Sequence, residues 1–242
     1  MLKENERIDD LQYKGLKIIQ NPDMFCFGLD AVILSDFSKQ IKPGSTVIDF
    51  GTGTGILPIL LSKKTENCKF IGIEIQKEVA EMAKRSVLLN KLENQIEIVN
   101  DDINNLDKKI KVDAVVTNPP YKQKNTGDTN INETQLISRH EIKCTLENIA
   151  QMAARVLDTK GAIYMVHRPE RLVQILEVFK KYKLETKEIR MVYPYVDKAP
   201  NLVLIKAVKD ANPFLKIQKP LIVYKKNGEY TDEILEIYNR KQ

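Results

Sequence analysis

Along the chain, segments with the apolar spacing of a strand alternate with segments with the apolar spacing of a helix. Short apolar runs predict buried strands at 46–50, 69–75, 96–100, 112–117 and 162–167. Helical spacing predicts a helix that opens at residue 56 and others over about 77–90, 146–157 and 170–181. Two longer strands, about 185–193 and 201–208, have only residues 194–200 between them, which indicates an antiparallel pair. The alternation predicts an α/β fold: a doubly wound, mostly parallel sheet with a terminal antiparallel strand pair.

The first 40 residues predict a small attachment to this core. Residues 11–13 and 16–19 flank Lys14-Gly15 and predict a short hairpin. Residues 31–37 predict a helix, for which Asp30 is a suitable N-cap. A ligand contact is the second interpretation of Asp30, and the two roles are compatible.

The C-terminal tail predicts another attachment. It carries an apolar run at 221–224, a turn at Asn227-Gly228 and a helix that begins at Thr231. With no internal repeat and no linker, we expect a single domain. Its expected parts are a hairpin and cap over 1–40, a core over 41–210 and an extension over 211–242.

Composition narrows the class of protein. Of the 242 residues, 43% are hydrophobic, which fits one large α/β domain. No apolar run reaches the roughly 18 residues of a membrane helix, and no apolar segment marks a signal peptide. Scattered Cys26, Cys68 and Cys144, with only two histidines, indicate a reducing cytoplasm and no metal site. The net charge of +5 permits a nucleic-acid partner but does not require one.

A glycine-rich turn follows the first core strand. The strand carries Asp49 and runs directly into Gly51, Gly53 and Gly55. The spacing is neither the dinucleotide-binding fingerprint nor a P-loop. Glycines at a strand-to-helix turn let the backbone approach a ligand closely, so we predict a ligand site here.

Acidic residues lie at or just after the carboxyl ends of the next two strands. Glu74 can accept hydrogen bonds from both ribose hydroxyls of an adenosine ligand. Asp102 can accept one from an adenine amine. The alternatives are a solvated glutamate at a strand end and an aspartate that caps the next turn.

The fourth core strand ends at Asn118-Pro119-Pro120-Tyr121. Two prolines cannot continue a central strand, because neither donates a backbone N–H. The Asn118 side-chain oxygen and the Pro119 carbonyl form an acceptor pair that suits a planar –NH2 group. Holding both hydrogens would stabilise positive charge that develops on the nitrogen, and Tyr121 offers a face for a stacked base. The alternative is that the prolines stop the strand and Asn118 caps a turn.

The residues after this tetrapeptide are polar. Residues 122–138 predict a loop beside the site, either a substrate lid whose Lys122 and Lys124 meet phosphates or a solvated loop. Arg139 and His140 come next. For His140 we expect substrate contact or plain surface rather than a role as general base, because attack by an amine on a strong electrophile does not require a base. His167 is expected to be a strand-end polar residue rather than a ligand.

The ordered set of motifs resembles the class I S-adenosylmethionine-dependent methyltransferases, whose fold is Rossmann-like. The set consists of residues 49–55, Glu74, Asp102 and the tetrapeptide 118–121. Within these enzymes, NPPY marks those that methylate exocyclic base amines or glutamine side chains. Residues 27–34, Arg139-His140-Glu141 and Tyr230-Thr231 further resemble the bacterial tRNA(Val) adenine N6-methyltransferases.

The resemblance implies S-adenosylmethionine as cofactor and tRNA as partner. The implied cofactor-binding residues are Phe27, Asp30, Asp49, Gly51, Gly53, Gly55, Glu74, Asp102 and Asn118. The implied catalytic residues are Asn118, Pro119 and Tyr121. The implied substrate-binding residues are Tyr121, Lys122, Lys124, Arg139 and His140, with phosphate contacts also from Lys216, Lys219, Lys225 and Lys226. We therefore expect a cytoplasmic enzyme that methylates N6 of an adenine in RNA, in the anticodon loop of a tRNA.

Two other functions share the motifs. Protein-glutamine methyltransferases carry NPPY, because a carboxamide also has two hydrogens to donate. That family usually has an N-terminal helical substrate domain, whereas only residues 1–45 precede the first predicted core strand here. The other function is a catalytically silent RNA-binding protein on the same fold, against which the intact Asn118 and glycines argue.

Overall fold

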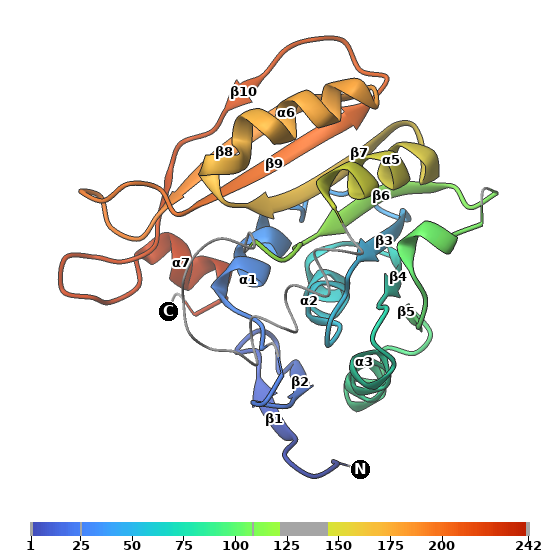
Figure 1. Cartoon of the computed structure of the whole chain (residues 1–242). Helices are drawn as coiled ribbons and strands as arrows, with labels where there is room; N and C mark the ends of the chain where they lie inside the picture. Colours follow the sequence, from blue (N-terminus) through green and yellow to red (C-terminus); the bar gives the residue numbers. More distant parts are fainter. Residues whose placement is uncertain (1, 25, 108, 122–144, 241–242) are drawn as a thin grey trace.

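A large twisted sheet with helices on both faces dominates the structure (Figure 1). The computed structural model describes residues 2–24, 26–107, 109–121 and 145–240. The strands of this sheet are β3 (Thr46–Phe50), β4 (Lys69–Ile73), β5 (Ile96–Val99), β6 (Val112–Thr117), β7 (Leu157–His167), β8 (Leu184–Tyr193), β9 (Leu202–Lys209), β10 (Lys216–Ile217) and β11 (Leu221–Ile222). Their order is β10-β8-β9-β7-β6-β3-β4-β5, and β11 also pairs with β8.

The strand directions confirm the predicted fold class. Strands β3 to β7 run parallel to one another, whereas β9 runs antiparallel to both β7 and β8. The chain order reverses at β3, which has β4 on one side and β6 on the other. Such a switch point opens a crevice at the carboxyl ends of the strands, where α/β proteins bind their ligands.

Helices cover both faces of the sheet. They are α1 (Leu29–Phe37), α2 (Ile56–Lys64), α3 (Lys77–Leu89), η1 (Ile103–Asn105), α5 (Leu146–Val156), η2 (Pro169–Arg171), α6 (Leu172–Lys181) and α7 (Asp232–Ile237). Helices α1, α2, α3 and α7 contribute to one hydrophobic cluster, and α5 and α6 contribute to the other. Within the described residues, none of the helices combines the length and apolar character needed to cross a membrane.

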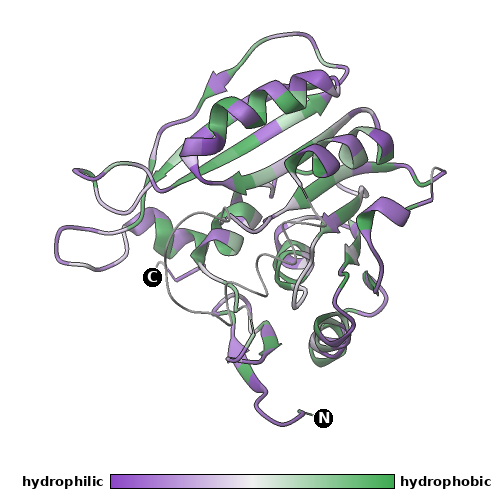
Figure 2. Cartoon of the chain, viewed as in Figure 1, coloured by the Kyte–Doolittle hydropathy of each residue, from purple (hydrophilic) through white to green (hydrophobic). Residues whose placement is uncertain are grey.

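The two clusters follow from alternation along buried strands. In β3, Val47 belongs to the cluster under α1 to α3 and Ile48 to the cluster under α5 and α6. In β6, Val116 belongs to the cluster under α1 to α3 and Val115 to the cluster under α5 and α6. Successive side chains of a strand point to opposite faces, so a continuous apolar run serves both layers. Figure 2 shows these strands as largely hydrophobic, with hydrophilic residues interspersed along α5 and α6.

A separate two-stranded sheet lies at the N-terminus. It pairs β1 (Arg7–Asp10) with β2 (Lys17–Gln20) in antiparallel fashion. The predicted first arm, 11–13, was therefore wrong, although a hairpin is present. The error has a physical cause: Leu11 and Leu16 are buried, and the Leu11 N–H donates to the Leu16 carbonyl at 2.9 Å, so both belong to the closing turn. The division into a cap, a core and an extension stays a prediction.

Further boundaries differ from the sequence predictions; β4, for example, ends at Ile73 rather than at residue 75. Helix α1 begins at Leu29 with Gly28 as its N-cap, so the predicted capping role of Asp30 was wrong. Asp30 lies in the first turn, where its carboxylate accepts the Ala31 N–H at 2.9 Å. Strand β7 begins at Leu157 rather than 162, because the chain passes from α5 straight into the sheet. Within the predicted 170–181 helix, a 3-10 turn, η2, precedes α6.

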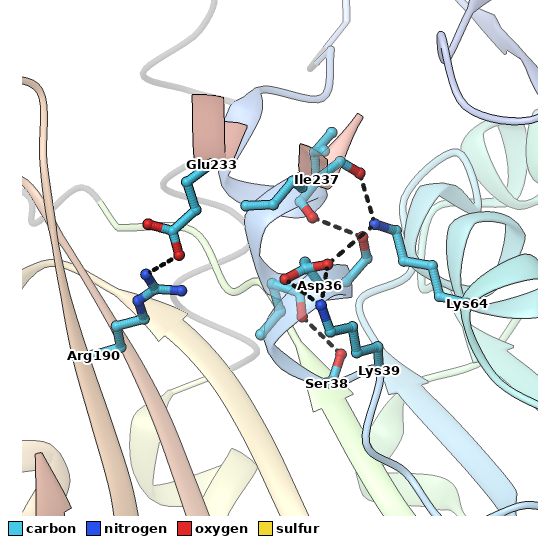
Figure 3. Close-up of polar contacts among 10 residues, drawn as sticks. Asp36, Ser38, Lys39, Lys64, Arg190, Glu233 and Ile237 are labelled. Atoms are coloured by element: carbon cyan, nitrogen blue, oxygen red, sulfur yellow. Dashed lines mark hydrogen bonds and ion pairs between the residues drawn. The ribbon is translucent and has the colours of Figure 1, made fainter. Parts of the chain in front are cut away.

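Polar contacts fasten α7 to the core (Figure 3). The Lys64 ammonium donates to the Ile237 carbonyl at 3.0 Å and lies 3.6 Å from Asp36. On the other side of the helix, Arg190 of β8 pairs with Glu233. Burial lowers the pKa of Lys64 to about 8, and the Asp36 carboxylate opposes this shift. Helix α7 is thus held to the C-terminal end of α2 and, through Lys64, to that of α1.

Candidate active site at the carboxyl edge of the sheet

Strand register brings the predicted motifs together at one edge. Phe50 pairs with Ile73 of β4 and with Thr117 of β6. The next residues along the three strands are Gly51, Glu74 and Asn118, so these three lie side by side. A glycine turn, a carboxylate and an amide far apart in the sequence therefore share one edge of the sheet.

The glycine turn leaves open space above the backbone. Gly51 and Gly53 have φ of +71° and +56°, a region that side chains rarely adopt. A Cβ built at either position would meet no heavy atom within 4 Å. Backbone amides of Gly51 and Thr52 donate to the Ile73 carbonyl at 3.0 and 2.9 Å, which fixes the turn against β4. The turn is thus rigid and uncovered, as close approach of a ligand requires.

Glu74 is held in one orientation by the turn. Its Oε2 accepts the Gly53 N–H at 3.0 Å, and its Oε1 accepts the Gln76 N–H at 2.9 Å. The residue is only 3% exposed, so the alternative of a solvated strand-end glutamate was wrong. A carboxylate has about four lone-pair positions, so each oxygen keeps capacity for one hydroxyl donor.

Asp49 is a buried carboxyl group beneath the turn. It is 1% exposed, and neither oxygen makes a hydrogen bond of good geometry with a described residue. Burial raises its pKa to about 7; the nearby Thr52 hydroxyl opposes this, and the charge of Glu74 adds to it. A buried carboxyl without a donor carries a large desolvation cost, which a cationic ligand group above the turn would reduce.

The segment after β5 borders the same edge of the sheet. Asp102 caps η1, and its Oδ1 accepts the Asn104 backbone N–H at 2.9 Å, so the capping interpretation is confirmed. Asn100, which sequence reasoning missed, donates to the Glu74 carbonyl at 2.8 Å and the Ile75 carbonyl at 3.2 Å. It ties the segment after β4 to β5. A polar residue at a strand end was its only signal in the sequence.

The tetrapeptide after β6 meets the N-terminus of α1. The Tyr121 hydroxyl contacts the Asn118 side-chain oxygen and lies 3.1 Å from Asp30 Oδ2. Burial raises the pKa of Tyr121 well above its usual value, and the Asp30 charge raises it further, so the hydroxyl keeps its proton and donates. The structure therefore joins two sequence motifs, 27–30 and 118–121, in one polar cluster.

Two residues at the end of β7 lie against Tyr121. The His167 ring meets the Tyr121 ring edge-on at 5.3 Å between centroids. The Arg168 guanidinium lies 5.4 Å from the Tyr121 ring centroid. The strand-end position expected for His167 is confirmed, but neither contact with Tyr121 was foreseen, because no spacing in the sequence relates β6 to β7.

The N-terminal hairpin holds the segment before α1. Gln20 is buried, its Oε1 accepts the Phe27 N–H at 3.0 Å, and its amide donates to Asp9 at 2.6 Å. Phe27 itself packs partly buried on the core. Sequence reasoning missed Gln20, because one polar residue at the end of an apolar arm carries no distinctive pattern.

Replacing Gln20 by alanine is expected to lower the free energy of unfolding by about 1–3 kcal/mol, because the buried Phe27 N–H loses its acceptor. Urea denaturation measures the change. The matched control is exposed Gln40→Ala, expected to change stability by less than about 0.5 kcal/mol. Equal stability of the two variants would contradict the anchoring role.

His167 is expected to make the protein acid-sensitive. Burial, with help from the Arg171 charge, lowers its pKa from 6.5 to about 4, and its Nδ1 accepts the Arg168 N–H at 2.8 Å. The unfolded chain takes up this proton below pH 6.5 and the folded protein only near pH 4. As the pH falls from 6.5 to 4, protonation of His167 in the unfolded chain therefore lowers the free energy of unfolding by up to about 3 kcal/mol.

The comparison with His167→Asn isolates this effect, because Asn can keep an acceptor for the Arg168 N–H. Asp49 acts in the opposite direction, since its raised pKa lets the folded protein hold a proton that the unfolded chain releases. Both proteins carry Asp49, so its contribution cancels in the difference. Denaturation at pH 7 and pH 4.5 should show wild type losing more stability; parallel losses would refute a buried neutral His167.

Four predicted substrate residues lie outside the described residues. They are Lys122, Lys124, Arg139 and His140, and the predicted loop at 122–138 lies there too. Among the other predicted site residues, the carboxyl edge gathers Asp49, the three glycines, Glu74, Asn118 and Tyr121, with Asp30 reaching it from α1.

Comparison with known proteins agrees with this geometry. A model of the methyltransferase small domain family matches residues 15–191. A curated relative from Porphyromonas gingivalis, named tRNA1(Val) (adenine(37)-N6)-methyltransferase, is 25% identical over 95% of this chain and 93% of its own. A relative of the same name from Haemophilus influenzae is 26% identical over 93% of this chain and 94% of its own. The family resemblance read from the motifs is confirmed.

Solved structures share the fold. A protein of Agrobacterium tumefaciens described as a predicted O-methyltransferase superposes with a TM-score of 0.70, at 19% identity, over 87% of this chain and 96% of its own. The 16S rRNA N2 G1207 methyltransferase of Thermus thermophilus, solved with AdoMet and guanosine, gives a TM-score of 0.62, at 18% identity, over 86% of this chain and 52% of its own. From the family match, the motif order and the strand order, we conclude that this chain is a methyltransferase that belongs to the methyltransferase small domain family.

Proposed function

We propose that the chain transfers a methyl group from S-adenosylmethionine to N6 of an adenine in RNA, in the anticodon loop of a tRNA. The observation that carries this proposal is the side-by-side placement of the glycine turn, Glu74 and Asn118. The names of the curated relatives support the choice of substrate.

The residues present fit the donor. Glu74 is pre-ordered to accept the ribose hydroxyls, and the open face above Gly51 and Gly53 admits the methionine part. Asp49 is a buried carboxyl group without a hydrogen-bond donor among the described residues, and a cationic ligand group above the turn would stabilise its ionised form. Phe27 and Asp30 precede or begin α1 and would cover the donor, and Asp102 would reach the adenine.

When bound, S-adenosylmethionine would supply a methyl group on a sulfonium sulfur: the amine lone pair would form the new N–C bond, the C–S electron pair would stay on sulfur, and the methylated nitrogen would release one proton to water. The Asn118 side-chain oxygen accepts a hydrogen bond from one N–H of the target amine, and the Pro119 carbonyl accepts one from the other N–H. These two acceptors stabilise the positive charge that develops on the nitrogen. Tyr121 provides a ring against which the flipped base rests.

The test is transfer of labelled methyl from S-adenosylmethionine to unmodified total tRNA, followed by nucleoside analysis. N6-methyladenosine in the product establishes the reaction and the class of substrate together. Label in a protein glutamine, with none in any RNA nucleoside, would move the assignment to a glutamine methyltransferase. Tight donor binding without transfer to RNA or protein would indicate a non-catalytic role.

A further inference from the structure

The order of strands sets the direction from which the substrate approaches. Along the carboxyl edge the order is β4, β3, β6 and β7. Glu74 follows β4 and the glycine turn follows β3, so the donor side lies at one end of this row. Asn118 follows β6, and Arg168 follows β7 beyond it. A substrate whose amine reaches Asn118 therefore has the rest of its structure on the β7 side.

Arg168 is held in place on that side. Its backbone N–H donates to the buried His167 Nδ1 at 2.8 Å, and its Nη1 donates to the Asn201 carbonyl at 3.0 Å. Its guanidinium lies 5.4 Å from the Tyr121 ring centroid. The contact with His167 thus holds the backbone of Arg168, and the contacts with Asn201 and Tyr121 orient its side chain before any substrate binds.

The guanidinium keeps unused binding capacity. Arginine carries five N–H donors, and the bond to Asn201 uses one of them. Among the described residues, no carboxylate lies within ion-pair distance of Arg168. The residue is exposed to solvent. An ordered cation beside an aromatic ring, without an anionic partner among the described residues, suits an anion that arrives with the substrate.

The geometry points to Arg168 as the residue that binds the phosphate backbone of the RNA strand at the nucleotide whose base rests on Tyr121. The inference depends on the proposed function, because it takes RNA as the substrate. A guanidinium matches a phosphate with paired N–H donors. Single-stranded RNA is commonly bound by aromatic rings for the bases and cations for the backbone, and Tyr121 with Arg168 provides one of each.

The competing explanation is that Arg168 only positions Tyr121. The two roles affect different kinetic constants. Loss of a phosphate contact weakens RNA binding and raises KM for tRNA, with kcat little changed. Loss of positioning lowers kcat and leaves KM for tRNA unchanged, and lysine would not restore it, because an ammonium lacks the planar group that lies over the ring.

The experiment compares wild type, Arg168→Ala and Arg168→Lys in methyl transfer to unmodified total tRNA, and in tRNA binding across a series of salt concentrations. The matched control is Lys69→Ala, which removes an exposed cation from the first residue of β4, at the opposite edge of the sheet. Thermal unfolding and S-adenosylmethionine affinity are measured for every variant to establish that the fold and the donor site are intact.

We expect Arg168→Ala to raise KM for tRNA roughly 10- to 100-fold, as loss of a hydrogen bond to a charged group does. The slope of log binding constant against log salt should become shallower by about 0.7, the value for one phosphate on a single strand. Arg168→Lys should fall between wild type and Arg168→Ala, and Lys69→Ala should match wild type.

A fall in kcat without a change in KM or salt slope would overturn the inference in favour of positioning. Wild-type behaviour of Arg168→Ala, in an enzyme that methylates tRNA, would also overturn it and leave the proposed function standing. Absence of methyl transfer to tRNA by the wild-type protein would overturn both.

Discussion

Replacing Asn118 by alanine is expected to reduce methyl transfer by at least about 10²- to 10³-fold, the loss found when one group that stabilises transition-state charge is removed. In the proposed mechanism the amide oxygen is the side-chain half of the acceptor pair for the target amine. In the free protein this oxygen contacts the Tyr121 hydroxyl, so it is already oriented toward the substrate side of the edge. Donor affinity should change by no more than about twofold, because the donor's ribose is assigned to Glu74 on the other side.

Single-turnover transfer to tRNA and equilibrium binding of S-adenosylmethionine separate these two effects. Asn118→Asp keeps a side-chain acceptor and should retain part of the activity that alanine loses. Exposed Asn94→Ala is the control for the removal of an amide elsewhere. A fully active Asn118→Ala protein would refute the acceptor role.

Replacing Glu74 by alanine is expected to weaken donor binding by about 10²-fold or more, since two hydrogen bonds from ribose hydroxyls to a carboxylate are lost. The same change releases the Gly53 and Gln76 amides, which the carboxylate now holds. Calorimetric titration with S-adenosylmethionine measures the loss. The control is Glu97→Ala, an exposed glutamate on neighbouring β5.

A donor analogue separates the two consequences. Wild type should bind a 2′-deoxyribose analogue of S-adenosylmethionine much more weakly than the natural donor, whereas Glu74→Ala should bind both alike. If the variant still discriminates against the analogue, Glu74 acts only by holding the glycine turn, and the ribose contact belongs to another residue.

The two variants have opposite expected signatures. Asn118→Ala should lose methyl transfer and keep its affinity for S-adenosylmethionine. Glu74→Ala should lose mainly its affinity for S-adenosylmethionine. The strand order predicts this separation, because the two side chains stand on either side of the glycine turn. The variants therefore also test whether the edge is divided into a donor side and an acceptor side.

Much of the fold follows from local sequence pattern. Periods of two and 3.6 residues located the core strands and helices, because buried strands and amphipathic helices leave their own spacing of apolar residues. The motif residues were found in the same way, since each lies at or just after the end of a predicted strand: Gly51 at β3, Glu74 at β4 and Asn118 at β6. Local pattern failed at the first hairpin arm and at the α1 cap. There, contacts such as Leu11 with Leu16 and Asp30 with Tyr121 decided the outcome.

The sequence by itself determined the candidate site residues: a glycine turn after one strand, a carboxylate at the end of the next and an acceptor after a later one. Only the tertiary structure decided which of these side chains lie together and what else lies beside them. Strand order and register are set by packing between segments distant in sequence, and no local spacing encodes them. For this reason Arg168 and His167 at Tyr121, and Gln20 under Phe27, became visible only in the folded chain.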